Sequence, residues 1–262
     1  MNTPANPIIF AGAGPGDPEL MTIKAMKALE SADLIIYAGS LVPEAVLIWK
    51  GDKTQTLSSA GMTLEDMVDT MANAQSKGQK VVRLHTGDPS LYGAIFEQIR
   101  ELQKKEIPYH VIPGVTAAFG AAARMGMEYT LPEVTQTLIL TRVSGRTPVP
   151  EAEDLDKLAA HQSSMAIYLS VGMAGKVQET LSKHYGPESL CAVAYKVGHP
   201  EEKILFTPLK ELDVCCETHD IHRHALIIVG KAVEASQGRH ELIKSKLYAA
   251  DFTHGYRDGR PA

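Results

Sequence analysis

Three glycine-containing loops, each placed between a short apolar run and a helical pattern, constrain the fold of this chain most strongly. They read GAGPGDP at residues 12–18, TGDPSL at residues 86–91 and PGVTA at residues 113–117. The apolar runs before them, at residues 8–11, 80–84 and 109–112, are short enough to be buried strands. Strands that alternate with helices are typical of a parallel α/β sheet. All three loops would then emerge at the carboxyl ends of strands, where open α/β sheets bind ligands.

The second half of the chain has a different spacing. Strands are expected at residues 137–141, 165–169, 190–197, 203–207 and 225–229. Several of these lie too close together for helical crossovers, which predicts a mixed sheet. The sequence therefore predicts two α/β domains, a mostly parallel one at residues 1–118 and a mixed one at 119–236, with a C-terminal extension at 237–262.

The first loop does not have the composition of a phosphate-binding loop. Pro15 lacks the N–H donor that a phosphate cradle uses, and Asp17 adds a negative charge where the dinucleotide fingerprint has Gly or Ala. The loop favours a ligand without phosphate and suits a cationic one. Asp17 and Asp88 each precede a proline, so helix capping is the alternative for both, with helices expected at 18–31 and 89–105. Asp88 is the better functional candidate because Gly87 lets a ligand approach the backbone.

Composition excludes several classes of protein. A net charge of −5 over 262 residues argues against a general nucleic-acid binder. No apolar run has the length of a membrane span, and the start of the chain does not have the pattern of a signal peptide. Three cysteines, two of them adjacent, do not form a disulfide framework, so a cytoplasmic protein is expected.

The run CCETHDIHRH at residues 215–224 is rich in metal-ligand residue types but matches no standard zinc spacing. His222 and His224 would share one face if this stretch were a strand. A polar entry to the strand at 225–229 is the preferred interpretation, and no metal is expected.

The loop motifs, extended by ELMT at residues 19–22, resemble those of the tetrapyrrole (corrin/porphyrin) methylases over nearly the whole chain. Further likeness lies in YAGSLV at residues 37–42, LPEVTQT at 131–137 and GRTPVPE at 145–151. Within the family these stretches resemble enzymes that methylate carbon 11 of precorrin-4 or cobalt-precorrin-4 in cobalamin biosynthesis. The resemblance implies a homodimer, with S-adenosylmethionine in a cleft between two α/β domains and a polycarboxylate tetrapyrrole as substrate.

The resemblance also assigns roles to individual positions. The cofactor-binding residues that it implies are Pro15, Thr86, Gly87, Asp88, Leu91, Thr116, Ala117, Leu169, Val197 and Ala225. Val197 is bulkier than the Gly or Ala common at its position, which suggests a contact through its backbone. Because the macrocycle carbon is electron-rich, no strong nucleophile is required, and Asp17, Asp88 and Glu128 are candidates only for removing a proton. Arg124, Arg142, Arg146 and Lys196 are expected to form a basic trough for the substrate carboxylates.

Other functions stay open at this point. A different precorrin methylase would carry the same family motifs, and an RNA or protein methyltransferase could share the fold, although the net acidity argues against RNA. A nicotinamide-dependent oxidoreductase is disfavoured by Asp17, and a metal-binding protein would use the cluster that ends at His224. The GDPE form of the first loop, at residues 16–19, favours the early-cobalt route.

Overall fold

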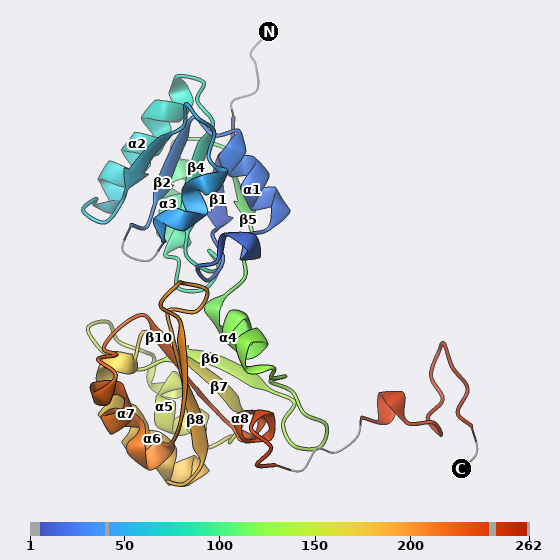
Figure 1. The fold of residues 1–262 in the computed structure, drawn as a ribbon. Helices are drawn as coiled ribbons and strands as arrows, with labels where there is room; N and C mark the ends of the chain where they lie inside the picture. The colour runs from blue at the N-terminus through green and yellow to red at the C-terminus, as the bar shows by residue number, and fades with distance from the viewer. Residues whose placement is uncertain (1–5, 40–41, 241–244, 261–262) are drawn as a thin grey trace. The chain divides into compact units, whose positions relative to one another are not determined.

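The computed structural model describes residues 6–39, 42–240 and 245–260, and it divides into two compact units (Figure 1). The first unit comprises the chain up to Gly120 together with Lys196–Glu202. The second comprises Ala121–Tyr195 and the chain from Lys203 onward. The domain limits 118/119 and 236/237 stay predictions, because these units are defined by contacts rather than by continuous segments. Ser40 and Leu41, in the YAGSLV motif, lie outside the described residues.

The first unit is built on a five-stranded parallel sheet with the strand order β3-β2-β4-β1-β5. Its strands are β1 (Ile8–Gly12), β2 (Leu34–Tyr37), β3 (Gln55–Ser58), β4 (Val81–His85) and β5 (Tyr109–Ile112). The predicted parallel sheet is therefore confirmed. Strand β3 was not predicted from the sequence, because it is an edge strand whose four residues are all exposed and which has no apolar alternation.

Helices cover both faces of this sheet, which explains why its central strands are almost continuously apolar. One face packs on α1 (Ile23–Glu30) and the 3-10 helix Glu44–Trp49, through residues such as Leu29 and Val46. The other face packs on α2 (Leu64–Ser76) and α3 (Ile95–Lys104), through residues such as Met71 and Leu102 (Figure 1).

Two helices of the first unit begin later than the sequence predicts. Pro18 opens a 3-10 turn, Pro18–Leu20, and α1 starts separately with Thr22 as its N-cap. The stretch after Pro89 consists of turns, and α3 starts only at Ile95 after a left-handed Ala94. Proline at a first helical position was thus read as the start of a long helix in both cases, whereas it initiates a turn.

The second unit holds a five-stranded mixed sheet with the order β6-β7-β10-β8-β9, in which only the β6–β7 pair is parallel. Its strands are β6 (Leu138–Arg142), β7 (Ser164–Tyr168), β8 (Leu190–Tyr195), β9 (Lys203–Pro208) and β10 (Ala225–Val229). The predicted mixed sheet is confirmed. The α-helices assigned wholly to this unit are α5 (Leu155–Ala159), α6 (Ala174–Tyr185), α7 (Leu212–Thr218) and α8 (Lys231–Ser236), while α4 (Ala117–Met125) contains the boundary between the units.

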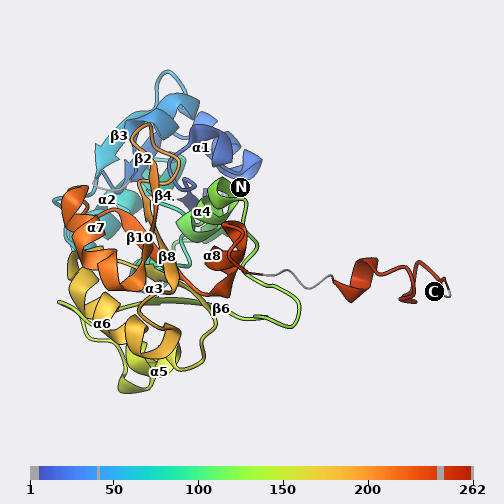
Figure 2. The ribbon, with the colours of Figure 1, turned by 60° about the horizontal axis from the view of Figure 1, so that its bottom comes forward.

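The second sheet also has helices on both faces. Figures 1 and 2 show α5, α6 and α7 on one face and α8 on the other. The core beneath the first three contains large aliphatic side chains such as Leu181, Leu212 and Ile227. No helix in the described part of the chain is long and apolar enough to span a membrane.

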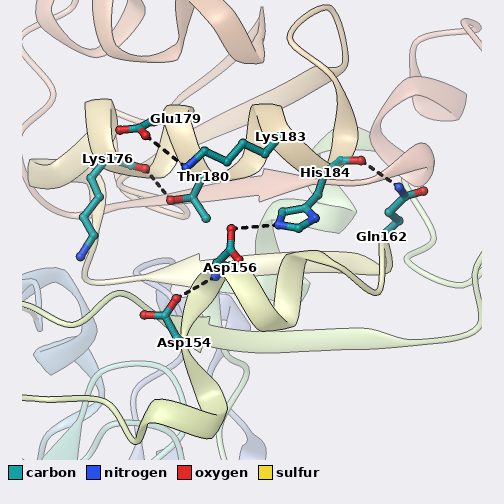
Figure 3. Close-up of polar contacts among 8 residues, drawn as sticks. All are labelled: Asp154, Asp156, Gln162, Lys176, Glu179, Thr180, Lys183 and His184. Carbon is teal, nitrogen blue, oxygen red and sulfur yellow. Dashed lines mark hydrogen bonds and ion pairs between the residues drawn. The ribbon is translucent and has the colours of Figure 1, made fainter.

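Polar contacts join α5 to α6 at the edge of this layer (Figure 3). Nε2 of His184 lies 3.0 Å from Oδ1 of Asp156, and Nε2 of Gln162 donates to the His184 carbonyl over 2.8 Å. Asp154 caps α5 by accepting from the Asp156 amide. The short helix α5 is therefore fixed at both ends, by its cap and by α6.

Candidate functional site

The three loops predicted from the sequence meet at the carboxyl edge of the first sheet, because β4, β1 and β5 are neighbours in the strand order. The Gly87 amide donates to the Gly14 carbonyl over 2.7 Å, and the Gly14 amide donates to the Gly87 carbonyl over 3.2 Å. The Gly114 amide donates to Oδ2 of Asp88 over 2.8 Å. Backbone and carboxylate hydrogen bonds thus join the three loops directly.

Glycine is required where these loops touch. A Cβ atom on Gly114 would lie 2.0 Å from the Gly87 carbonyl oxygen, and one on Gly12 would lie 2.5 Å from the Gly114 Cα. Neither distance is compatible with a side chain, and the neighbouring atoms are backbone that cannot move away cheaply. The glycines therefore permit backbone contact between loops, a different role from cradling a phosphate.

Asp88 holds two of the loops together. Its Oδ1 accepts from the amide and the hydroxyl of Ser90, while its Oδ2 accepts from Gly114. Partial burial raises the pKa of this carboxyl, but the hydrogen bonds from Ser90 and Gly114 outweigh burial and leave the pKa below its usual value. Asp88 does not cap a helix, so the capping alternative is wrong for this residue.

Asp17 has the capping role that the sequence suggested. Its Oδ1 accepts from the Glu19 amide over 2.9 Å, and it precedes the 3-10 turn Pro18–Leu20 rather than a long helix. Pro15 and Gly16 beside it are buried. The loop is thus shaped by its own backbone and by its neighbours.

A fourth segment, Lys196–Glu202, packs against the first loop. A Cβ atom on Gly120 would lie 3.0 Å from Cγ1 of Val197 and 3.2 Å from Cγ of Pro15, so these two side chains flank the same glycine. A Cβ atom on Gly198 would lie 2.7 Å from the Asp17 amide nitrogen. The sequence analysis placed Val197 near the cofactor only by resemblance; the structure brings it beside Pro15.

Most of the cofactor-binding candidates fall within the first unit. They are Pro15, Thr86, Gly87, Asp88, Leu91, Thr116, Ala117 and Val197. Gly87 lies against the third loop, since a Cβ atom there would be 3.6 Å from the Thr116 Cα and 4.0 Å from the Ala117 nitrogen. The Leu91 amide donates to the Asp88 carbonyl over 3.2 Å. The structure therefore brings these candidates together around the carboxyl edge of the sheet.

Leu169 and Ala225 belong to the second unit. Leu169 follows β7 in a left-handed conformation with φ 54° and is 65% exposed, which is unusual for a leucine. Ala225 is buried at the start of β10 and pairs with Tyr195 of β8. These two positions stay predictions.

The substrate-binding candidates are divided between the units. Lys196 belongs to the first unit, where its Nζ lies 3.7 Å from Oε2 of Glu201. Arg124, Arg142 and Arg146 belong to the second. Arg142 donates to the carbonyls of Thr147 and Pro148 over 3.1 and 2.7 Å, so it holds the loop that carries the exposed Arg146.

The proton-removal candidate Glu128 is exposed in the second unit, and its Oε1 accepts from the Thr130 hydroxyl over 3.1 Å. Asp17 and Asp88, by contrast, accept from backbone amides in the first unit. The structure thus gives the three candidate carboxylates different surroundings.

Two buried residues of β4 were not singled out from the sequence. Arg83 donates to the neutral oxygens of Gln98, Ile36 and Leu84, and burial lowers its pKa to about 10. His85 is 4% exposed, and its Nε2 has no hydrogen-bond partner among the described residues. Burial, and then the charge of Arg83, lowers the pKa of His85 to about 3. Polar residues inside an otherwise apolar strand were the available signal.

The stretch at residues 215–224 is not a strand. Cys215 and Cys216 lie in α7, while His222 and His224 lie in a bend before β10. The idea of two histidines on one strand face is therefore wrong. Within the described ranges, no group of three His, Cys, Asp or Glu residues is arranged to hold a metal ion.

Comparison with known proteins adds independent information. The family model described as Tetrapyrrole (Corrin/Porphyrin) Methylases matches residues 7–213. A cobalt-precorrin-4 C(11)-methyltransferase of Methanocaldococcus jannaschii is 49% identical over 251 residues, covering 95% of each chain. A precorrin-4 C(11)-methyltransferase of Pseudomonas aeruginosa is 44% identical over 253 residues, covering 96% of this chain and 99% of that protein.

A solved structure and a more distant relative agree with these matches. The X-ray structure of a cobalt precorrin-4 methyltransferase, a cobalamin biosynthetic enzyme, has a TM-score of 0.84 and 43% identity, covering 86% of this chain and 95% of that one. An S-adenosyl-L-methionine-dependent uroporphyrinogen III methyltransferase of Arabidopsis thaliana is 33% identical over 242 residues, covering 87% of this chain and 64% of that protein. By its loops, its two sheets and these likenesses, the chain belongs to the tetrapyrrole (corrin/porphyrin) methylases.

Proposed function

We propose that this protein transfers a methyl group to carbon 11 of cobalt-precorrin-4 in cobalamin biosynthesis. The observation that carries the proposal is the 49% identity, over 95% of both chains, to the cobalt-precorrin-4 C(11)-methyltransferase. The 44% identity to a precorrin-4 enzyme makes the cobalt-free substrate the second candidate. Both substrates would be methylated on the same carbon.

The proposed methyl donor is S-adenosylmethionine, and the loops of the first unit support this choice. The Gly14 and Gly87 amides donate to each other's carbonyls, and the Gly114 amide donates to Asp88. These amides are therefore occupied, whereas a phosphate site would need them free. A cofactor with a sulfonium cation and no phosphate fits such loops better than a dinucleotide. A relative that carries S-adenosyl-L-methionine in its name adds support.

We assign cofactor binding chiefly to the first-unit candidates at the carboxyl edge of the sheet. The backbone of the loops at 14–17, 86–88 and 114–117 is fixed by the contacts between them, so it forms a preorganised wall. When bound, S-adenosylmethionine supplies an electrophilic methyl carbon on its sulfonium. The task of the residues around it is to align that carbon with the macrocycle and to exclude water.

In this mechanism the new carbon–carbon bond forms as the sulfur–carbon bond breaks, and a proton leaves the macrocycle. Asp88 is a weak base because its hydrogen bonds lower its pKa, so we assign it to holding the loops. Asp17 is assigned to capping. Glu128, whose carboxylate accepts only from a hydroxyl among the described residues, stays our candidate proton acceptor. Arg146 is our first candidate for binding a substrate carboxylate, since Arg142 holds its loop.

The direct test is incubation with S-adenosylmethionine and either precorrin-4 or cobalt-precorrin-4, followed by mass spectrometry and NMR. We expect a mass gain of one methyl group, located at carbon 11, with the cobalt substrate preferred. Methylation at another ring carbon would support a different precorrin methylase of the same family. No mass gain on either substrate would refute the proposal.

We further propose that the protein is cytoplasmic and acts as the homodimer that the resemblance implies. All three cysteines are free thiols, which suits a reducing compartment. Light scattering on the purified protein should give twice the mass of the 28.4 kDa chain. A monomer mass at micromolar concentration would contradict the dimer without affecting the proposed reaction.

A further inference from the structure

The segment Lys196–Glu202 carries a histidine that has no role in the reaction proposed above. The His199 ring lies beside the Pro15 backbone, which opposes the larger effect of burial on the pKa of the ring. A Cβ atom on Gly16 would lie 2.3 Å from Cδ2 of His199 and 2.8 Å from its Nε2. The ring is therefore packed directly on the backbone of the first loop.

The backbone of the segment determines where this ring lies. The His199 amide donates to the Lys196 carbonyl over 2.9 Å, and the Glu202 amide donates to the His199 carbonyl over 3.0 Å. The Gly198 amide donates to Oε2 of Glu202 over 2.6 Å. Gly198 has φ +79° and comes close to the Asp17 amide, an approach that a residue with a side chain would not allow. The segment is thus braced by its own hydrogen bonds.

Burial favours the neutral form of the ring. Burial is the main cause that lowers the pKa of His199, and Lys196 lowers it further, while Glu201, Glu202 and the Pro15 backbone act in the opposite direction. A neutral imidazole has one N–H to donate. That single donor is available to the Pro15 carbonyl.

We propose that His199 is a positioning residue for the loop at residues 14–17: it fixes the Pro15 carbonyl and fills the space beside Gly16, so that the loop is held ready for the cofactor. The part of this inference that concerns the cofactor rests on the proposed function. The part that concerns the loop does not, because it follows from contacts within the first unit.

The loop is tested first without ligand, by hydrogen–deuterium exchange of the full-length protein. His199→Leu keeps an apolar side chain of similar size but removes the donor, whereas His199→Gln keeps a donor. Losing one hydrogen bond shifts the local opening equilibrium of the loop about three- to tenfold toward the open form. Amides of the peptide 12–20 should therefore exchange about three- to tenfold faster in His199→Leu. His199→Gln should stay within about twofold of the wild type by the same measure, because its amide can donate to Pro15. His161→Leu, the same change at an exposed histidine of the second unit, is the control.

The cofactor is tested next, by titrating the same variants with S-adenosylhomocysteine in a calorimeter. The Kd should rise about three- to tenfold in His199→Leu and should be restored in His199→Gln. Thermal melting of each variant separates this effect from general instability, because a merely structural role would lower the Tm without the recovery in His199→Gln.

The two measurements separate the two claims. Unchanged exchange of the peptide 12–20 in His199→Leu would overturn the positioning role, whatever the titration gives. Equal loss in His199→Leu and His199→Gln would also overturn it, since the donor would then not matter. Faster exchange in His199→Leu, together with a wild-type protein that does not bind S-adenosylhomocysteine, would support the positioning role and contradict the proposed cofactor.

Discussion

Replacing His85 by leucine should remove a pH dependence of folding that the buried ring creates. In the folded protein the pKa of His85 is about 3, because the ring is buried and lies near Arg83. In the unfolded chain the pKa is about 6.5. A folded-state pKa below the unfolded value means that acid favours the unfolded chain, which takes up the proton more readily. The contribution of His85 to stability is therefore complete above pH 6.5 and is lost as the pH falls from there toward 3.

The size of the effect at pH 5.5 follows from these two values. One pH unit below 6.5, the unfolded ring is about 90% protonated, which stabilises the unfolded state by about 1.4 kcal/mol. The folded ring stays neutral at this pH, because 5.5 lies well above 3. The wild type should therefore lose about 1.4 kcal/mol of unfolding free energy through this residue between pH 7.5 and pH 5.5. His85→Leu should not lose it.

Urea unfolding at the two pH values measures this difference. Trp49 is the sole tryptophan of the chain, and its indole Nε1 donates to the Pro18 carbonyl over 3.2 Å, so its fluorescence reports on the first unit. Any packing cost of the leucine enters equally at both pH values and cancels in the comparison. His110→Gln, at an exposed histidine on β5 of the same unit, should keep the wild-type loss. If His85→Leu loses as much stability as the wild type on acidification, the reasoning is refuted.

Three further substitutions test how the loops are held. Asp88→Asn replaces an anion that accepts from Ser90 and Gly114 by an amide whose NH₂ must face a donor. The free energy of unfolding in urea should fall by about 2 kcal/mol, against under about 1 kcal/mol for Asp17→Asn. Equal losses in the two variants would contradict the assigned roles. Gly114→Ala puts a methyl group 2.0 Å from the Gly87 carbonyl oxygen. The variant should lose at least about 2 kcal/mol of unfolding free energy or fail to fold, and a wild-type Tm would contradict the close contact. Arg142→Lys loses the paired donors to the carbonyls of Thr147 and Pro148. Amides of the loop 143–148 should then undergo hydrogen–deuterium exchange about threefold faster. Unchanged exchange would show that the arginine does not hold this loop.

Most strands were predictable because a short apolar run is distinct from the polar residues on either side of it. The bounds expected for β5 and β10 are the observed ones. The edge strand β3 was not predictable from this signal, since Gln55 and its neighbours are exposed and gain their strand conformation from pairing with β2. The helix α7 was missed for a different reason: its two cysteines suggested metal chemistry, whereas Cys216 is a core residue.

The three loops of the candidate site were predictable from their glycines, but the purpose of the glycines was not. The sequence suggested an approach by a ligand at Gly87, and the structure shows that Gly12 and Gly114 first of all allow one loop to touch another, while Gly87 has a positive φ. His199 could not be assigned from the sequence, because 183 residues separate it from Gly16 and no local pattern connects them. Contacts of this kind depend on the tertiary fold, which one sequence does not reveal residue by residue.

The placement of Lys196–Glu202 also has a consequence for how the gene can be divided. The chain passes between the two units three times, at Gly120, at Tyr195 and at Glu202, and the first passage lies inside the continuous helix α4. A single cut anywhere therefore leaves at least one half incomplete: a fragment that stops at residue 120 keeps the whole first sheet and yet lacks the residues that pack on Gly16. Split reporters and hybrid enzymes made by exchanging one half at residue 120 would combine a loop from one parent with a His199 from the other. Such hybrids would need to match at Gly16, Gly198 and His199, positions far from the join.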